Sequence, residues 1–119
     1  RVYRVNQLSA FLLLKHVLPH MVARKYGHVL MFASIAGKDG NPGMCAYTST
    51  KAAVIGLVKG VGKEYAETGI TVNAVAPEYI ETAMTAVLTD AQKTAMTQHI
   101  PLGRVGTDVE IAHAVAFLA

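Results

Sequence analysis

The hydrophobic positions of the first 25 residues follow a helical repeat. Apolar side chains recur three or four residues apart, at Val5, Leu8, Phe11, Leu12, Val17, Leu18, Met21 and Val22. This spacing predicts a helix over residues 1–25. Pro19 lies inside the helix and should kink it, and Gly27 should end it as a C-terminal glycine does.

Two shorter runs have the pattern of strands. Residues 28–33 (HVLMFA) are nearly all apolar, which predicts a strand buried on both faces of a parallel sheet covered by helices. Residues 70–76 (ITVNAVA) predict a second strand, entered through Gly69 and stopped by Pro77. Residues 34–44 are rich in glycine, so they are predicted to form a loop.

A second long helix is predicted over residues 46–67, with apolar side chains on nearly all sides. Such a helix is buried on nearly all sides, so one side should face the sheet and another a second subunit. Inside a helix, Gly56, Gly60 and Gly62 cost about 1 kcal/mol each relative to alanine. They are therefore expected where other backbone packs closely.

The remaining residues predict shorter helices. Two are expected around residues 80–88 and 90–99, and a last helix should begin at Thr107 or Asp108. Thr107 and Glu110 have the spacing of a capping box. The order helix, strand, helix, strand, helix predicts an α/β fold with a parallel sheet.

Composition restricts the class of protein. The chain has 119 residues, 52% hydrophobic and 16% charged, so its length allows one compact domain and no more. The net charge is +3 and the basic residues are scattered, which argues against a nucleic-acid partner.

Cys45 is the single cysteine, as is common in a reducing compartment. No apolar run approaches the ~20 residues of a membrane span, and no signal-peptide pattern is seen. A cytoplasmic protein without a membrane partner is expected.

Tyr47 and Lys51 are the main chemical signal. Four residues apart, they share one face at the start of the second long helix. An ordinary tyrosine hydroxyl stays protonated at neutral pH, so it cannot act as a base. A nearby cation stabilises the phenolate and lowers the pKa. Lys51 is therefore expected to tune Tyr47 as a general acid and base. The alternative is a surface pair that happens to have this common spacing.

Two further polar residues are candidates. Ser34 follows the first strand, at the end where α/β sheets bind ligands, and could hold a substrate oxygen. Asn6 lies among apolar positions of the first helix, which is unfavourable unless its amide is used. The alternatives are a turn serine and an exposed helical asparagine.

Several strings resemble the short-chain dehydrogenase/reductases, in the right order and over essentially the whole chain. They are VNQLSAF (5–11), GHVLMFAS (27–34), SIAG (34–37), YTSTK (47–51), ITVNAVAP (70–77), ETAM (81–84) and PLGRVGTDVEIAHAVAFLA (101–119). The resemblance implies part of a doubly wound, Rossmann-like domain. It also implies an NAD(P)-dependent oxidoreductase that interconverts a secondary alcohol and a ketone.

The resemblance also implies a role for named residues. Tyr47 would exchange a proton with the substrate oxygen, and Ser34 would bind that oxygen. Lys51 would bind the nicotinamide ribose, and Asn6 would hold a water in a proton relay to Lys51. The implied cofactor, NAD or NADP, would contact Tyr47, Lys51, Pro77, Ile80 and Thr82. The partners expected are a carbonyl or alcohol substrate and further copies of the chain, as a homodimer or homotetramer through helices 1–25 and 46–67.

The chain departs from the family pattern in two ways. Glu78 stands where glycine usually follows the strand-ending proline, which restricts the backbone and places a carboxylate near the nicotinamide segment. The glycine-rich turn that binds the pyrophosphate and the last strand of the fold are not in the sequence. We therefore expect an internal to C-terminal piece of the domain, inactive alone.

Other candidates are weaker. His16 and His20 have helical spacing for a metal pair, but no third ligand is suitably placed, so no metal is expected. Cys45 has no partner that would make it a nucleophile. The family resemblance is closest to 3-oxoacyl thioester reductases, with sugar, polyol or deoxy-sugar-acid dehydrogenases as one alternative. The others are a fragment that acts only in subunit assembly and an inactive relative marked by Glu78.

Overall fold

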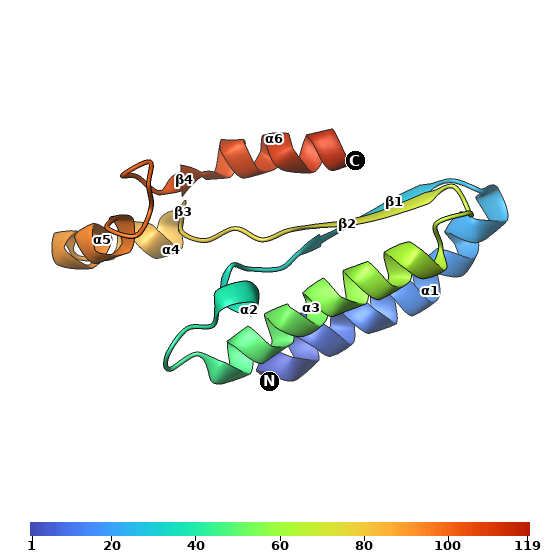
Figure 1. The fold of residues 1–119 in the computed structure, drawn as a ribbon, viewed down its shortest axis with the longest axis horizontal. Coiled ribbons are helices and arrows are strands. Elements are labelled where there is room, and N and C mark those ends of the chain that lie inside the picture. The colour runs from blue at the N-terminus through green and yellow to red at the C-terminus, as the bar shows by residue number, and fades with distance from the viewer.

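Two parallel strands lie between helices on both sides (Figure 1). The computed structural model describes the backbone of residues 1–119 and every side chain except that of Met84. The elements of this layered part are η1 (Arg4–Leu8), α1 (Ser9–Arg24), β1 (Gly27–Phe32), α2 (Ala36–Asp39), α3 (Cys45–Glu64), β2 (Ile70–Val75) and α6 (Asp108–Leu118). α1 and α3 cover one face of the sheet, and α6 lies over the other. The predicted α/β class with parallel strands is confirmed.

The register of the two strands brings their carboxyl ends together. Gly27 lies opposite Ile70, and Phe32 opposite Val75. The pairing continues beyond the strands, because the Ala33 N–H donates to the Val75 carbonyl at 2.8 Å and the Ile35 N–H to the Pro77 carbonyl at 3.1 Å. The two segments that follow the strands therefore start side by side.

The core lies between the paired helices and one face of the sheet. Leu14 and Leu18, one helical turn apart on α1, meet Val61 of α3 and Ile70 of β2. Each is at most 9% exposed. Burial of one such leucine contributes about 1.5–3 kcal/mol. Helix α1 is thus anchored by a narrow stripe, which fixes how it lies along α3.

Helix α1 differs from its prediction at both ends. Its first turn is a π-helix over Arg4–Leu8. At the other end the predicted glycine cap is wrong, because Lys25 ends the helix in the left-handed region with φ 52°. Its N–H donates to carbonyls of the last turn. Gly27 instead begins β1, where a Cβ would lie 2.5–2.9 Å from the Met21 side chain.

Three more expectations need correction. β1 is not buried on both faces, since His28 is exposed and Phe32 is 53% exposed; α6 covers only part of the outer face. The predicted loop at 34–44 contains α2, a short helix that Gly40 ends with φ 78°. The close backbone expected at three glycines of α3 is found only at Gly62, where a Cβ would lie 3.6 Å from the Val72 carbonyl oxygen; outside the helix itself, no described atom lies within 4 Å of a Cβ built on Gly56 or Gly60.

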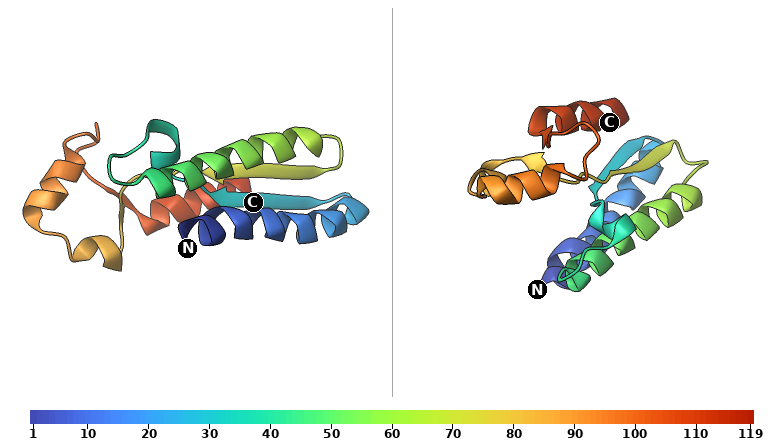
Figure 2. Two further views of the ribbon diagram at one scale, coloured as in Figure 1. Left: turned by 90° about the horizontal axis from the view of Figure 1, so that it is seen from below. Right: turned by 60° about the vertical axis from the view of Figure 1, so that its left-hand side comes forward.

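A smaller unit extends beyond the layered part (Figure 2). It consists of β3 (Ile80–Glu81), α4 (Ala83–Ala86), α5 (Asp90–Thr97) and β4 (Gly106–Thr107). β3 and β4 form a two-stranded parallel pair that the sequence pattern does not predict. The predicted short helices are confirmed as α4 and α5, and the capping box of Thr107 and Glu110 begins α6. The Met84 side chain, at the end of the ETAM string, lies outside the described residues.

Candidate functional site

Tyr47 and Lys51 lie in the first turns of α3, beside the carboxyl end of β1. The Lys51 Nζ donates a hydrogen bond of 2.7 Å to the carbonyl of Phe32, the last residue of β1. The same ammonium lies 5.7 Å from the centroid of the Tyr47 ring. The Phe32 carbonyl therefore holds the cation next to the phenol, while both side chains stay partly open to solvent.

Ser34 follows β1 and is 8% exposed. Its Oγ accepts a hydrogen bond of 3.2 Å from the Ala36 N–H, which turns the chain into α2. Since a hydroxyl donates one hydrogen bond and accepts two, the Ser34 proton remains free to be donated. This fits a residue that would hold a substrate oxygen.

Gly37 lets α2 lie directly against α3. A Cβ at Gly37 would lie 2.6 Å from the carbonyl carbon of Lys51 and 2.7 Å from the nitrogen of Ala52. Both atoms belong to helix backbone, so they have little freedom to move away. The contact therefore fixes the Ser34 segment relative to the helix that carries Tyr47. In the sequence, Gly37 is one glycine of a glycine-rich loop, and nothing local marks its contact with α3.

Asn6 lies in η1 and reaches α3 one turn beyond Tyr47. Its Nδ2 is 3.5 Å from the Oγ1 of Thr50, and the Thr50 hydroxyl donates to the Tyr47 carbonyl at 2.8 Å. The structure thus brings Asn6 next to the Tyr47–Lys51 turn across 44 residues of sequence. No local sequence pattern marks the contact of Thr50 with Asn6. The π-helix at Asn6 is of a kind often found at functional sites.

The residues predicted to contact nicotinamide are more spread out. Pro77 and Ile80 line a mostly apolar cavity of about 550 Å³ between the sheet end and α6, together with Phe32, Asp108, Ile111, Ala112, Val115 and Ala116. Thr82 is exposed and precedes α4, where its N–H donates to the Thr85 hydroxyl at 2.8 Å. The structure thus brings Pro77 and Ile80 together at one cavity, and Thr82 is not among the residues that line it.

A second cavity, of about 620 Å³, opens beside the loop before α3. Its lining residues are Asn41, Pro42, Met44, Glu78, Tyr79, Gln92, Ala95, Met96 and His99. Glu78 does not strain the backbone, because Lys25 is the one non-glycine residue with positive φ among the described residues. Glu78 therefore changes the site through the negative charge that it brings to the cavity wall, and not through the backbone.

The remaining candidates have no partners that would make them a site. His16 and His20 are exposed on α1, and no group of three His, Cys, Asp or Glu residues is arranged for a metal in the part of the chain described. Cys45 is a free, exposed thiol at the start of α3. None of the described helices is long and apolar enough to cross a membrane.

Sequence relatives share this whole segment. The family described as enoyl-(acyl carrier protein) reductase matches residues 1–119. The 3-oxoacyl-[acyl-carrier-protein] reductase of Haemophilus influenzae is 44% identical over 118 residues, which make up 99% of this chain and 49% of that protein. The chain thus spans about half the length of the curated relatives it matches.

Solved structures agree with the sequence relatives. The 3-oxoacyl-[acyl-carrier protein] reductase of Brucella melitensis is similar with a TM-score of 0.93 and 32% identity, over 98% of this chain and 44% of that one. ElxO with NADP bound is similar with a TM-score of 0.89 and 36% identity, over 96% of this chain and 47% of that one. The chain belongs to the enoyl-(acyl carrier protein) reductase family of the short-chain dehydrogenase/reductases.

Proposed function

We propose that residues 1–119 form the catalytic part of an NAD(P)-dependent oxidoreductase that interconverts a secondary alcohol and a ketone. The observation that carries this proposal is the Lys51 ammonium, held by the Phe32 carbonyl at 2.7 Å beside the Tyr47 ring. Among substrates of this chemistry, we favour 3-oxoacyl thioesters, since curated relatives such as that of Haemophilus influenzae are named for them. A place in the cytoplasm is part of the same proposal.

The residues present fit the nicotinamide end of the cofactor. A lysine ammonium has three N–H donors, and one of them is used on Phe32. The other two remain for ribose hydroxyls at the carboxyl end of β1, where parallel sheets bind ligands. Pro77 and Ile80, which line the mostly apolar cavity at the same end of the sheet, would contact the nicotinamide. When bound, the nicotinamide supplies or accepts the hydride.

The side chains of this chain would handle the proton. In reduction, the Tyr47 hydroxyl gives its proton to the substrate oxygen, and in oxidation the phenolate takes that proton back. Ser34 donates its free hydroxyl proton to the same oxygen and holds it near Tyr47. Lys51 holds its ammonium beside the Tyr47 ring, and Asn6 would hold a water that returns the proton from solvent.

The Tyr47→Phe variant tests this mechanism in the intact protein. General acid catalysis contributes typically 10²–10⁴-fold, so kcat should fall by about that much while NAD(P) still binds. Tyr65→Phe is the matched control, since Tyr65 lies at the opposite end of α3 and should leave kcat unchanged. Retention of full kcat in Tyr47→Phe would overturn the assignment.

A sugar, polyol or deoxy-sugar-acid substrate is the second candidate. The wall of the 620 Å³ cavity carries Asn41, Glu78, Gln92 and His99, which could bind several hydroxyl groups. A substrate panel at fixed cofactor separates the two classes. Turnover of polyols but not of 3-oxoacyl thioesters would favour this second candidate, and failure of both classes would exclude both.

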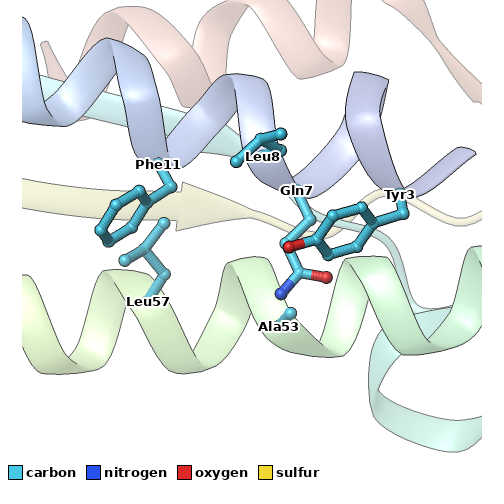
Figure 3. Close-up of a pocket in the computed structure, with 6 residues that line it drawn as sticks. All are labelled: Tyr3, Gln7, Leu8, Phe11, Ala53 and Leu57. Atoms are coloured by element: carbon cyan, nitrogen blue, oxygen red, sulfur yellow. The ribbon is translucent and has the colours of Figure 1, made fainter.

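We also propose that copies of the chain associate through α1 and α3. Phe11 of α1 and Tyr3, which precedes η1, are 52% and 55% exposed, respectively. Phe11 also lines a cavity of about 400 Å³ between the two helices, with Tyr3, Gln7, Leu8, Ala53 and Leu57 (Figure 3). Gly56 and Gly60 leave open space on α3. A second copy that packs its own helix pair there would bury this apolar face, as a homodimer or as half of a homotetramer.

A further inference from the structure

The 620 Å³ cavity beside the loop before α3 has a single carboxylate in its wall. Its lining includes no lysine, arginine or aspartate, and Glu78 is its one glutamate. Glu78 is exposed. The ion pair of Arg104 with Glu110 is the one that the described side chains form, so Glu78 has no cationic partner among them. The negative charge of Glu78 is therefore left for a ligand of the cavity.

The hydrogen bonds of the two amides in the wall decide what else they offer a ligand. The Asn41 Nδ2 donates to the Met44 thioether at 3.9 Å, which leaves the Asn41 amide oxygen as an acceptor. The Gln92 Oε1 is used in the capping box of α5, which leaves the Gln92 Nε2 as a donor. The wall thus offers two acceptors, the Glu78 carboxylate and the Asn41 oxygen, to a positively charged donor, and one N–H to a neutral oxygen of the same ligand.

An organic cation fits this wall better than a metal ion does. Calcium and similar ions take several oxygen ligands, and no group of three His, Cys, Asp or Glu residues is arranged for a metal among the described residues. A volume of about 620 Å³ is instead that of a small-molecule site. Tyr79, Met44 and Met96 give the wall an aromatic ring and two thioethers, against which the carbon atoms around a charged nitrogen can pack.

The cavity begins close to the candidate catalytic residues. Met44 lines it and precedes Tyr47 by three residues, which is about 4.5 Å along a helix axis. The Met44 carbonyl accepts from the Thr48 N–H at 2.8 Å, so the first turn of α3 already includes Met44. A ligand whose reacting oxygen lies at Tyr47 can therefore extend past Met44 into the cavity.

We propose that the Glu78 cavity binds a positively charged nitrogen, so that the substrate carries an ammonium or quaternary ammonium group away from its carbonyl. The inference rests on the proposed oxidoreductase function and names a substrate class for it. The charged nitrogen would end the acyl chain of a thioester, or replace one hydroxyl of a sugar. This specificity belongs to the chain itself, because the family pattern has glycine in place of Glu78.

Choline and 3,3-dimethylbutan-1-ol test the charge at equal shape, because they differ only in a nitrogen cation or a neutral carbon at the branched centre. Ligand-observed NMR titrations of the intact protein should give choline a Kd about three- to tenfold lower than that of the alcohol. The titrations are run at low salt, which screens an exposed charge least. They are run at pH 8, because histidines such as His99 in the same wall gain charge mainly at lower pH.

Two variants assign this preference to one carboxylate. Glu78→Gln should bind choline and the alcohol equally, since it keeps the shape of the side chain and removes the charge. Glu81→Gln is the matched control and should keep the wild-type preference, because the exposed Glu81 carboxylate of β3 lines a different cavity. Equal Kd values in the wild type, no binding of choline, or a preference that survives in Glu78→Gln would each overturn the proposal.

Turnover separates this inference from the proposed function. Two 3-oxoacyl thioesters of equal length, one ending in an ammonium and one in a methyl group, are compared in the wild type and in Glu78→Gln. The wild type should have a kcat/KM about three- to tenfold higher for the ammonium substrate, and Glu78→Gln should lose this preference. If no carbonyl substrate is turned over while choline is still preferred, the proposed function fails and the cation site stands. Turnover of both thioesters at equal kcat/KM would overturn the cation site and leave the proposed function intact.

Discussion

Glu78 is the residue whose charge should matter most for the choice of substrate. Its side chain lines the 620 Å³ cavity with Gln92 and His99, and its backbone lies outside the left-handed region. Glu78→Gly and Glu78→Gln should both raise kcat/KM for 3-oxoacyl thioesters, because each removes a carboxylate from the cavity wall. Both should lower kcat/KM for polyols by about tenfold or more, because a bond to a charged acceptor contributes about 1.5–3 kcal/mol.

Glu78→Gln is the more informative of the two substitutions, since it changes the charge and keeps the backbone preferences of a long side chain. If only Glu78→Gly raised activity, the backbone and not the charge would be limiting. If neither variant changed an already active protein, the idea of a relative inactivated by Glu78 would fail.

Gly37 should be intolerant of even one methyl group. Its Cβ would overlap the backbone of α3 at Lys51 and Ala52, and overpacking of this kind costs about 1–3 kcal/mol. Gly37→Ala should lower the free energy of unfolding by that amount, measured by urea denaturation, and should also lower kcat by moving the Ser34 segment. The control is Gly62→Ala, where a Cβ would lie 3.6 Å from the Val72 carbonyl oxygen. This variant should gain up to about 1 kcal/mol from helix propensity.

The candidate catalytic side chains could be predicted from the sequence more readily than the residues that hold their helix in place. Tyr47 and Lys51 are linked by helical spacing, which a sequence shows directly. Gly37 and Thr50 act through segments far away along the chain, so no local pattern identifies them. Their contacts arise only because α2 and η1 pack against α3.

At the scale of elements, the start of α6 should depend on pH. The hydrogen bond from the Arg104 guanidinium at 2.7 Å, together with that from the Thr107 N–H at 2.8 Å, lowers the pKa of Glu110 to about 2 from its ordinary 4.5. Because the folded pKa lies below the unfolded one, the contribution to stability is complete above about pH 4.5 and is lost as the pH falls toward 2. The pair is exposed, so the effect should be small and weaker in high salt.

The thermal unfolding temperature between pH 2 and pH 6 measures this contribution. Glu110→Gln should flatten the dependence on pH, and Arg104→Met should flatten it in part, since the bond from Thr107 is kept. A wild-type profile identical to that of Glu110→Gln would contradict the role of this carboxylate.

Helix boundaries show why some elements could be predicted and others could not. The capping box of α6 is a local motif, so Thr107 and Glu110 predicted its start correctly. The predicted end of α1 was wrong. A glycine just after a helix usually marks its C-cap, but Gly27 is a glycine because the Met21 side chain packs against it and leaves no room for a Cβ. Strands of two residues, such as β3, carry no periodicity at all.

At the scale of the whole molecule, some apolar faces of the sheet and helices are covered by other parts of this chain, and others remain exposed. The parallel pair and its helix layers were predicted from the alternation of elements. The prediction that β1 is buried on both faces was wrong, because α6 covers only part of its outer face and Phe32 stays exposed. A pattern of apolar residues shows that a face is to be covered, but it does not identify what covers it.

The apolar face of α1 and α3 should determine the oligomeric state. If a second copy packs against it, Phe11→Glu would bury an unpaired carboxylate in the contact, which is strongly unfavourable. Sedimentation of the intact protein at micromolar concentration should then show a homodimer or homotetramer for the wild type and a smaller species for Phe11→Glu. Val87→Glu is the control, because Val87 is 83% exposed in the unit beyond the sheet and should leave the assembly intact. A wild-type monomer would overturn the proposed association of copies through this face, and an unchanged oligomer in Phe11→Glu would place the contact elsewhere.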